Sequence, residues 1–154
     1  EGASARLKAG HREVADVVES FEKGRGADKA SLARQIAAAL TVHARIEEEL
    51  LYPQAREALD EEDRDLIDEA EVEHASIKQL VAEIERGTPE DEHFDARVKV
   101  VGEYVQHHVK EEERKLFPLL RKAKLDLKEL GAQLATRKAE LASEIEEGPK
   151  PSRH

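Results

Sequence analysis

The chain contains no cysteine, and this absence excludes disulfides, thiolate metal sites and cysteine nucleophiles. It also lacks an apolar run near the roughly 18 to 20 residues that a membrane span needs, and no signal peptide is recognisable. We therefore expect no membrane partner and a cytoplasmic location. The sequence begins at Glu1 rather than at methionine, which is compatible with the removal of leader residues.

Positive charge is scarce relative to negative charge, with 25 Lys and Arg against 35 Asp and Glu and a formal net charge of −10. This balance argues against a basic nucleic-acid footprint, so we expect no nucleic-acid partner. No nucleophile elbow and no phosphate-binding glycine run is present, so serine-type and phosphate-loop enzymes have no support. Aromatic residues are only 3% of the chain, whereas aliphatic residues and helix formers dominate, as in a helical bundle with small core side chains.

Apolar residues recur at steps of three and four along most of the chain, which predicts amphipathic helices. We expect an all-α fold, an up-down-up-down four-helix bundle over about 4–122 with a shorter C-terminal fifth helix over about 126–147. These belong to one domain, 1–148, followed by a flexible tail at 149–154. The predicted bundle helices span about 4–23, 29–59, 62–86 and, from a Thr88-Pro89 start, to 122. Pro53 and Pro118 should kink the second and fourth.

A His-x-x-x-Glu pair occurs twice, and each copy follows a single histidine by about one helix. In chain order these residues are His11, His43 with Glu47, His74, and His108 with Glu112. The second pair follows the first by about 65 residues, which indicates a duplicated αα-hairpin. One site built from two similar halves is the simplest interpretation.

A single histidine on an apolar stripe is more often a core residue that is hydrogen-bonded within the protein than a metal ligand. Here all four predicted bundle helices carry one, and two of them carry a glutamate one turn later. Residues four apart share a helix face, with about 5 to 6 Å between their Cβ atoms. Buried carboxylates without partners cost several kcal/mol each, and no Lys or Arg lies on the inner stripes nearby. The pattern therefore favours a bound metal.

The twofold pattern predicts two metal ions. Each hairpin would supply two imidazoles to one ion, His11 with His43 and His74 with His108, while the two glutamates bridge both ions. This leaves positions open to water, an oxo or hydroxo bridge, or a small ligand. Imidazole and carboxylate ligands without sulfur suit iron or manganese, and zinc is also compatible.

The order His, His-x-x-x-Glu, His, His-x-x-x-Glu, with its Leu-(Tyr/Phe)-Pro tails, resembles the hemerythrin-like HHE cation-binding family. The resemblance covers roughly residues 4–122, and the last helix, with Leu130-Gly131, resembles the extension of bacterial stand-alone members. It implies a four-helix bundle around a non-haem centre of two Fe ions, oxo- or hydroxo-bridged. The ligands that it implies are His11, His43, Glu47, His74, His108 and Glu112.

Two positions depart from the family pattern. Oxygen-carrying members have an additional histidine where this chain has Ala70, and an acid often stands where this chain has Gly10. The resemblance implies a small-molecule partner such as O2, peroxide or NO, and Ala70 favours redox reactivity or sensing over oxygen carriage. Peroxide disproportionation is one reaction that the family allows. The alternative is an iron- or oxygen-responsive sensing or interaction module without turnover. A structural bundle with adventitious zinc would make the repeat a coincidence.

Several neighbouring polar and aromatic residues are weaker candidates. Tyr104 lies one turn before His108 and could contact the metal or its bound ligand, or it could belong to the core. We expect Glu48 and Glu113 to be solvated or paired between helices, with contact to the metal ligands as the less favoured alternative. We expect Glu73 to be interhelical or exposed rather than a ligand, and His107 to lie at the surface. The Tyr52-Pro53 and Phe117-Pro118 pairs are expected to pack and bend their helices.

Overall fold

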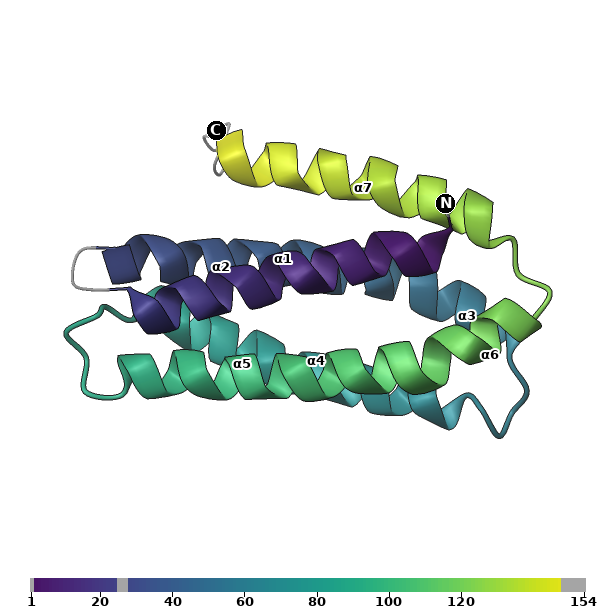
Figure 1. Ribbon diagram of the computed structural model, residues 1–154, viewed down its shortest axis with the longest axis horizontal. Coiled ribbons are helices and arrows are strands. Elements are labelled where there is room, and N and C mark those ends of the chain that lie inside the picture. The colour runs from purple at the N-terminus through teal and green to yellow at the C-terminus, as the bar shows by residue number, and fades with distance from the viewer. Residues whose placement is uncertain (1, 25–27, 148–154) are drawn as a thin grey trace, which may run out of the picture.

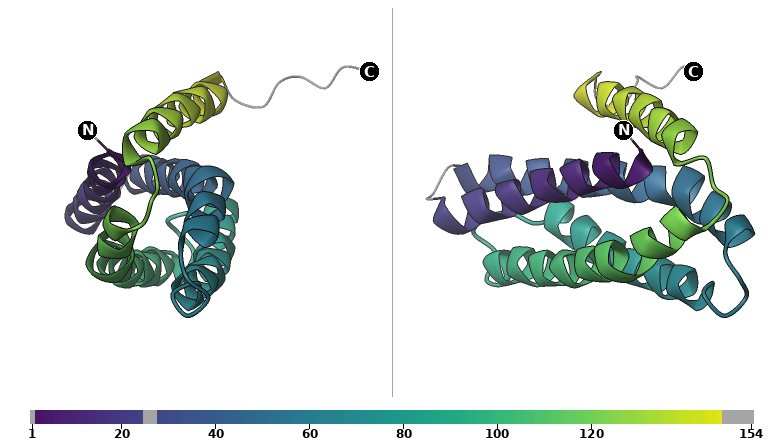
Figure 2. Two further views of the ribbon diagram at one scale, coloured as in Figure 1. Left: turned by 90° about the vertical axis from the view of Figure 1, so that its right-hand side faces the viewer. Right: turned by 45° about the vertical axis from the view of Figure 1, so that its right-hand side comes forward.

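The part of the chain that the structure describes forms five helical segments, of which four make an antiparallel bundle and one packs outside it (Figures 1 and 2). The structure, a computed structural model, describes residues 2–24 and 28–147, with side chains through residue 144. The segments are α1 (Ala3–Lys23), α2 (Asp28–Ile46) continued by η1 (Glu47–Leu51) and α3 (Tyr52–Ala58), α4 (Asp65–Arg86), α5 (Phe94–Glu111) continued by η2 (Glu112–Leu116) and α6 (Phe117–Lys122), and α7 (Leu127–Glu147). The predicted all-α bundle is confirmed.

The bundle is two hairpins laid together. The first hairpin pairs α1 with the long helix that α2, η1 and α3 form, and the second pairs α4 with the long helix of α5, η2 and α6. The end-on view in Figure 2 shows the four helices around a common centre. The α7 helix packs on the outer side of the first hairpin, against α1, α2 and η1. At 21 residues α7 equals α1 in length and is one residue shorter than α4, so the fifth helix is clearly shorter only than the two long helices.

The apolar interior consists of two clusters separated along the bundle axis. Leu7 on α1 and Ala70 on α4 belong to one cluster, whereas Val14 and Ile77 belong to the other. His11 and His74 lie between these pairs in their own helices. The predicted ligand residues therefore occupy a polar layer between two apolar clusters, which shield that layer from water.

The two long helices contain a π-helical turn instead of the simple proline kink that the sequence suggests. Each π turn begins at a predicted bridging glutamate, Glu47 or Glu112, and ends just before an aromatic-proline pair. Proline cannot donate to the carbonyl four residues earlier, so a local change of register from i→i+4 to i→i+5 accommodates it. The backbone N–H of Tyr52 accordingly donates to the carbonyl of Glu47, five residues back.

The predicted start of the fourth bundle helix at Thr88-Pro89 is wrong, because α5 begins at Phe94. The Asp91 carboxylate accepts a hydrogen bond from the backbone N–H of Thr88 (2.8 Å) and closes a local turn. This local bond competes with helix formation over the same residues. The Arg25-Gly26 break and the tail at 149–154 lie outside the described residues. Within the described part of the chain, none of the helices is both long enough and apolar enough to cross a bilayer.

Candidate metal centre

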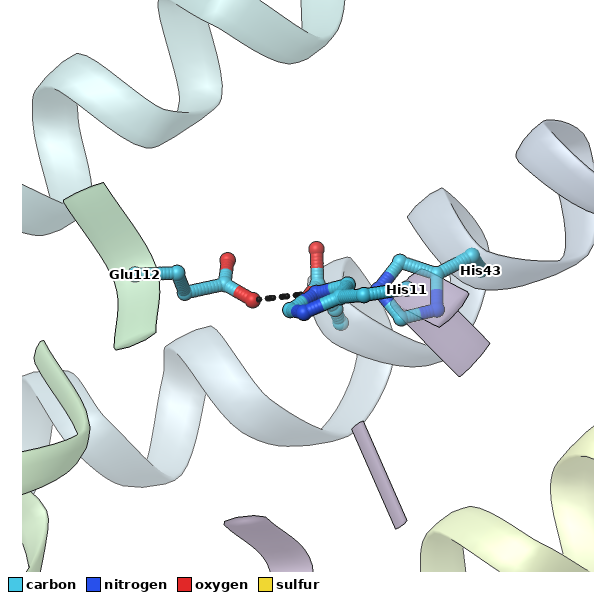
Figure 3. A group of neighbouring side chains, drawn as sticks. His11, His43 and Glu112 are labelled. Carbon is cyan, nitrogen blue, oxygen red and sulfur yellow. Dashed lines mark hydrogen bonds and ion pairs between the residues drawn. The ribbon is translucent and has the colours of Figure 1, made fainter. Parts of the chain in front are cut away.

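The six predicted ligand residues meet at the centre of the bundle. Each histidine offers a nitrogen atom to one of two groups and each glutamate offers an oxygen atom to both, and within each group these atoms lie within 4.8 Å of one another. Five are buried, whereas His43 is in part exposed. Figure 3 shows the Glu112 side chain pointing from η2 towards His11, and the His43 ring beside His11. The members are His11 on α1, His43 on α2, Glu47 on η1, His74 on α4, His108 on α5 and Glu112 on η2.

The two groups share both carboxylates and differ in their histidines. The first position comprises His11 and His43 with the two glutamates, and the second position comprises His74 and His108 with the same two glutamates. This division by hairpin matches the sequence prediction. The two positions therefore are adjacent parts of one cluster and not separate sites.

Each glutamate presents one oxygen to each position. In Glu47, Oε2 lies 3.1 Å from Nε2 of His43, and Oε1 lies 3.0 Å from Nε2 of His74. In Glu112, Oε1 lies 3.1 Å from Nε2 of His11, and Oε2 lies 2.9 Å from Nε2 of His108. A carboxylate that divides its oxygens between two donor sets has the geometry needed to bridge two ions.

Three of the four histidines donate their outer nitrogen to a carboxylate. Nδ1 of His11 donates to Glu113, Nδ1 of His74 to Glu48 and Nδ1 of His108 to Glu73, each at 2.7 Å; none of these bonds involves the predicted bridging residues. In the neutral ring that binds a metal, this contact fixes the tautomer in which Nε2 carries the lone pair, and it makes the imidazole a better metal ligand. These three acids therefore orient the histidines, whereas the sequence favoured solvated or interhelical roles and kept contact with the metal ligands as the lesser alternative for Glu48 and Glu113.

His43 is the exception among the four. Among the described side chains, those of residues 2–24 and 28–144, no carboxylate lies within 4 Å of its Nδ1 atom. A Cβ atom built on Gly10 would approach Nδ1 to 2.8 Å. The residue before His74 is Glu73, which accepts the hydrogen bond from His108. The residue before His11 is Gly10, which has no side chain to do the same for His43. The twofold repeat thus places a glycine where the second hairpin has the orienting acid.

Tyr52 contributes a hydroxyl group to the cluster that sequence analysis missed. Its side chain is 1% exposed, and its OH donates to Glu112 (2.9 Å) or Glu47 (3.1 Å). The same oxygen lies 3.1 Å from Nε2 of His74 and 3.3 Å from Nε2 of His108. The i→i+5 turn explains this placement, because it brings residue 52 back over residue 47. Tyr52 therefore adds an oxygen to the second position.

The matching residue of the other hairpin is Phe117, which has no hydroxyl. Its ring stacks on His11 with 6.2 Å between the centroids and 5° between the planes. It is fully buried, as Tyr52 nearly is. The same π turn thus brings an aromatic side chain to each position, but only the second position gains a polar atom.

The buried charges change the proton affinities of the cluster. Burial alone would lower the pKa of His11, but hydrogen bonds and charges from Glu112 and Glu47 outweigh it and raise that pKa to about 10. The same balance raises the pKa of His108 to about 11. At His74, burial again lowers the pKa, but the contacts with Glu47 and Glu48 outweigh it and raise the pKa. Burial would raise the pKa of Glu47, but the surrounding histidines hold it well below its usual value. In the metal-free protein, protons on the imidazoles supply the cationic charge that these carboxylates need.

The donor set fits metal ions well. Imidazole nitrogens and carboxylate oxygens converge without sulfur, and the outer nitrogens of three imidazoles are already directed to carboxylates. A model of the hemerythrin HHE cation binding domain matches residues 3–120. The chain belongs to the hemerythrin HHE cation-binding family.

Two known proteins resemble this HHE domain over different lengths. A crystal structure of a hemerythrin HHE cation binding domain-containing protein from Mycobacterium kansasii superposes with a TM-score of 0.82. The match covers 99% of this chain and 95% of that one at 21% identity, which shows a shared fold that includes α7. A protein from Nostoc sp. named DNA nickase is 38% identical over 88 residues, which are 56% of this chain and 24% of that protein. The chain thus spans about a quarter of the length of that relative.

Tyr104, a weaker candidate in the sequence, does not reach the centre of this HHE domain. Its side chain is 47% exposed, so it does not join the cluster. At 3.6 residues per turn, residue 104 lies roughly 40° outside the stripe that carries residues 98, 101, 108 and 112. His107 is at the surface as expected, with 65% of its side chain exposed, near Glu73 and Glu111.

Proposed function

We propose that this HHE domain binds two iron ions, one in each position, and that O2, peroxide or NO binds or reacts there. The observation that supports two ions is the division of Glu47 and Glu112 between the two histidine pairs. Iron is the metal that the family resemblance favours, and manganese and zinc are compatible with the same donors. When bound, two iron ions supply one- and two-electron redox chemistry and positions for a small ligand.

The protein's own residues would orient the ions and limit access by water. The Nε2 atoms of the four histidines and the oxygens of both glutamates are the proposed ligands, and Tyr52 lies where its hydroxyl can bind a metal ion or donate a hydrogen bond. Glu48, Glu73 and Glu113 hold three of the imidazoles by their outer nitrogens. The apolar clusters on both sides of the polar layer restrict the approach of solvent.

Metal analysis of protein expressed in iron-replete medium tests this proposal. We expect about two irons per chain and near-ultraviolet absorption from ligand-to-iron charge transfer. Glu112→Ala should lose both ions and the absorption, His43→Ala should retain at most one ion, and His107→Ala should behave like the unmodified protein because His107 is exposed. One zinc per chain, or unchanged metal content in both site variants, would refute the proposal.

A peroxide assay on the same iron-loaded sample then separates the two classes of function. Oxygen release that depends on Glu112 supports turnover of peroxide. Metal binding without oxygen release favours the alternative, an iron- or oxygen-responsive module. The expectation of no nucleic-acid partner stays a prediction, and the name of the Nostoc relative makes a nicking assay on supercoiled DNA the appropriate check.

A further inference from the structure

A groove of about 320 Å³ lies between α1, α2 and α7 and reaches the edge of the proposed metal centre. Its floor includes Gly10 and His43, and its mouth carries Glu13 and Lys138, which form an ion pair at 3.1 Å. The wall from α7 includes Ala142. Two cavities that border His108 are much smaller, about 10 Å³ and about 20 Å³, and the larger of these also borders His74. Cavities of these sizes hold about one water molecule at most.

The groove exposes one of the four histidines more than the others. The side chain of His43 is 12% exposed, against 5% for His11, 5% for His74 and 6% for His108. A Cβ atom at residue 10 would meet its Nδ1, so this nitrogen faces the glycine that lines the groove. The first position is therefore the one that solvent approaches.

His43 also lacks the hydrogen bond from Nδ1 to a carboxylate that the other three histidines make. His108, its counterpart in the repeat, donates to Glu73 at 2.7 Å, whereas Gly10 offers His43 no side chain. Loss of such an outer carboxylate typically weakens metal affinity about 10- to 100-fold. The second position gains an additional oxygen from Tyr52, and the corresponding Phe117 has none. The exposure of His43, the missing acid at Gly10 and the missing hydroxyl at Phe117 all weaken the first position relative to the second.

We propose that the ion in the first position is the exchangeable one, and that it enters and leaves through the groove between α1, α2 and α7. This inference rests on the proposed two-ion function, because it assigns different properties to the two ions. The second position then holds its ion more firmly, behind the closed packing of α4 and α5. The centre can pass between a one-ion and a two-ion form without unfolding of the bundle.

Chelation kinetics test the proposal directly. Ferrous protein with two irons per chain is mixed anaerobically with excess of a coloured ferrous chelator, and iron release is followed with time. We expect two phases of about one ion each, the first about 10- to 100-fold faster. A single phase that releases both ions would overturn the inference.

Glu73→Gln identifies which ion leaves late. This variant removes the carboxylate from His108 while preserving side-chain shape, so it should speed the slow phase about tenfold or more and leave the fast phase unchanged. Faster release in the first phase alone would show that the second position empties first and would overturn the assignment.

A matched pair of substitutions on α7 tests the route. Ala142 lines the groove, and Ala139 is exposed on the same helix outside it. Ala142→Phe should slow the fast phase several-fold and leave the slow phase unchanged, while Ala139→Phe changes neither. An unchanged fast phase in Ala142→Phe would overturn the route. Failure to load two irons at the outset would instead refute the proposed function, which keeps the two claims separate.

Discussion

The two hairpins of this HHE domain supply the same proposed ligands but surround them differently. Each contributes two histidines and one glutamate, and each has a π turn that begins at that glutamate. They differ where Glu73 of the second hairpin corresponds to Gly10 of the first, and where Tyr52 corresponds to Phe117. The repeat therefore preserves the donor atoms, while two single-residue differences make the surroundings of the two positions unequal.

This difference shows how a duplicated site can acquire two unlike halves. The bridging glutamates belong to both positions, so changes there should affect both ions. Changes at Gly10 or Tyr52 should affect one ion, because each residue contacts only part of the cluster. Substitutions at these three places test whether the halves are independent or act as one unit.

Glu47→Gln should have the largest effect, because it acts on both halves. The Glu47 carboxylate lies 3.8 Å or less from the Nε2 atoms of all four histidines, and it is completely buried. We expect iron content to fall from about two ions to well below one per chain, measured by elemental analysis. Glu49→Gln is the control, since Glu49 pairs with surface arginines. Retention of one tightly bound ion in Glu47→Gln would show that the positions do not share this ligand.

Gly10→Ala should weaken metal binding at the first position alone. The new methyl group would lie 2.8 Å from Nδ1 of His43, so the imidazole must move away from the position that it occupies. We expect the affinity for one of the two ions to fall at least about tenfold, measured by metal titration, and the other to be unchanged. Gly102→Ala is the matched control, because its methyl group would meet only Val18, at 3.1 Å. Equal weakening of both ions would contradict the independence of the halves.

Tyr52→Phe should make the second half resemble the first. The substitution removes the hydroxyl next to His74 and His108 and leaves a ring like that of Phe117. We expect up to about tenfold weaker binding of the second ion, and hence more nearly equal affinities in the same titration. Tyr104→Phe, a change to an exposed tyrosine, should leave both affinities as they are. A larger gap between the two affinities in Tyr52→Phe would be the contrary result.

The two positions should differ least in the number of protons that they release on metal binding, because each contains one imidazole with a strongly raised pKa. The pKa values of about 10 for His11 and about 11 for His108 leave both protonated at pH 7 without metal, and a metal ion requires the neutral ring. We expect about two protons released per chain, measured by calorimetry in buffers of different ionisation enthalpy. Release of no protons would contradict these shifts.

The same shifts predict the pH dependence of the metal-free fold. A folded-state pKa above the usual value of 6.5 contributes stability that is fully present below pH 6.5 and is lost as the pH rises through about 10. Thermal unfolding of metal-free protein should therefore occur at lower temperature at pH 10 than at pH 7. An unchanged midpoint would show that His11 and His108 are not charged in the folded state.

The sequence predicted the bundle and the six clustered residues because both depend on helical periodicity. His43 and Glu47 are four residues apart on one apolar helix face, and such a face packs on the core whatever its individual side-chain contacts are. The repeat then required the two hairpins to meet. By contrast, the α5 start was misplaced, because a side-chain bond from Asp91 decided that turn.

The surroundings of the cluster were harder to predict, because they depend on contacts between helices and on a local register change. Tyr52 is five residues after Glu47, which an α-helix would place on another face, and only the π turn returns it to the cluster. Glu48 and Glu113 follow the bridging acids and reach histidines of the opposite hairpin. Alignment of the two halves contained the relevant signal, since it sets Glu48 beside Glu113 and Glu73 beside Gly10.

X-ray absorption at the iron edge tests the central claim, that two half-sites form one dinuclear centre, most directly. The sharing of Glu47 and Glu112 predicts an iron neighbour within about 4 Å of each iron in the loaded protein. The iron–iron signal should disappear in Glu47→Gln. Two irons per chain with no iron neighbour at that distance would contradict the account.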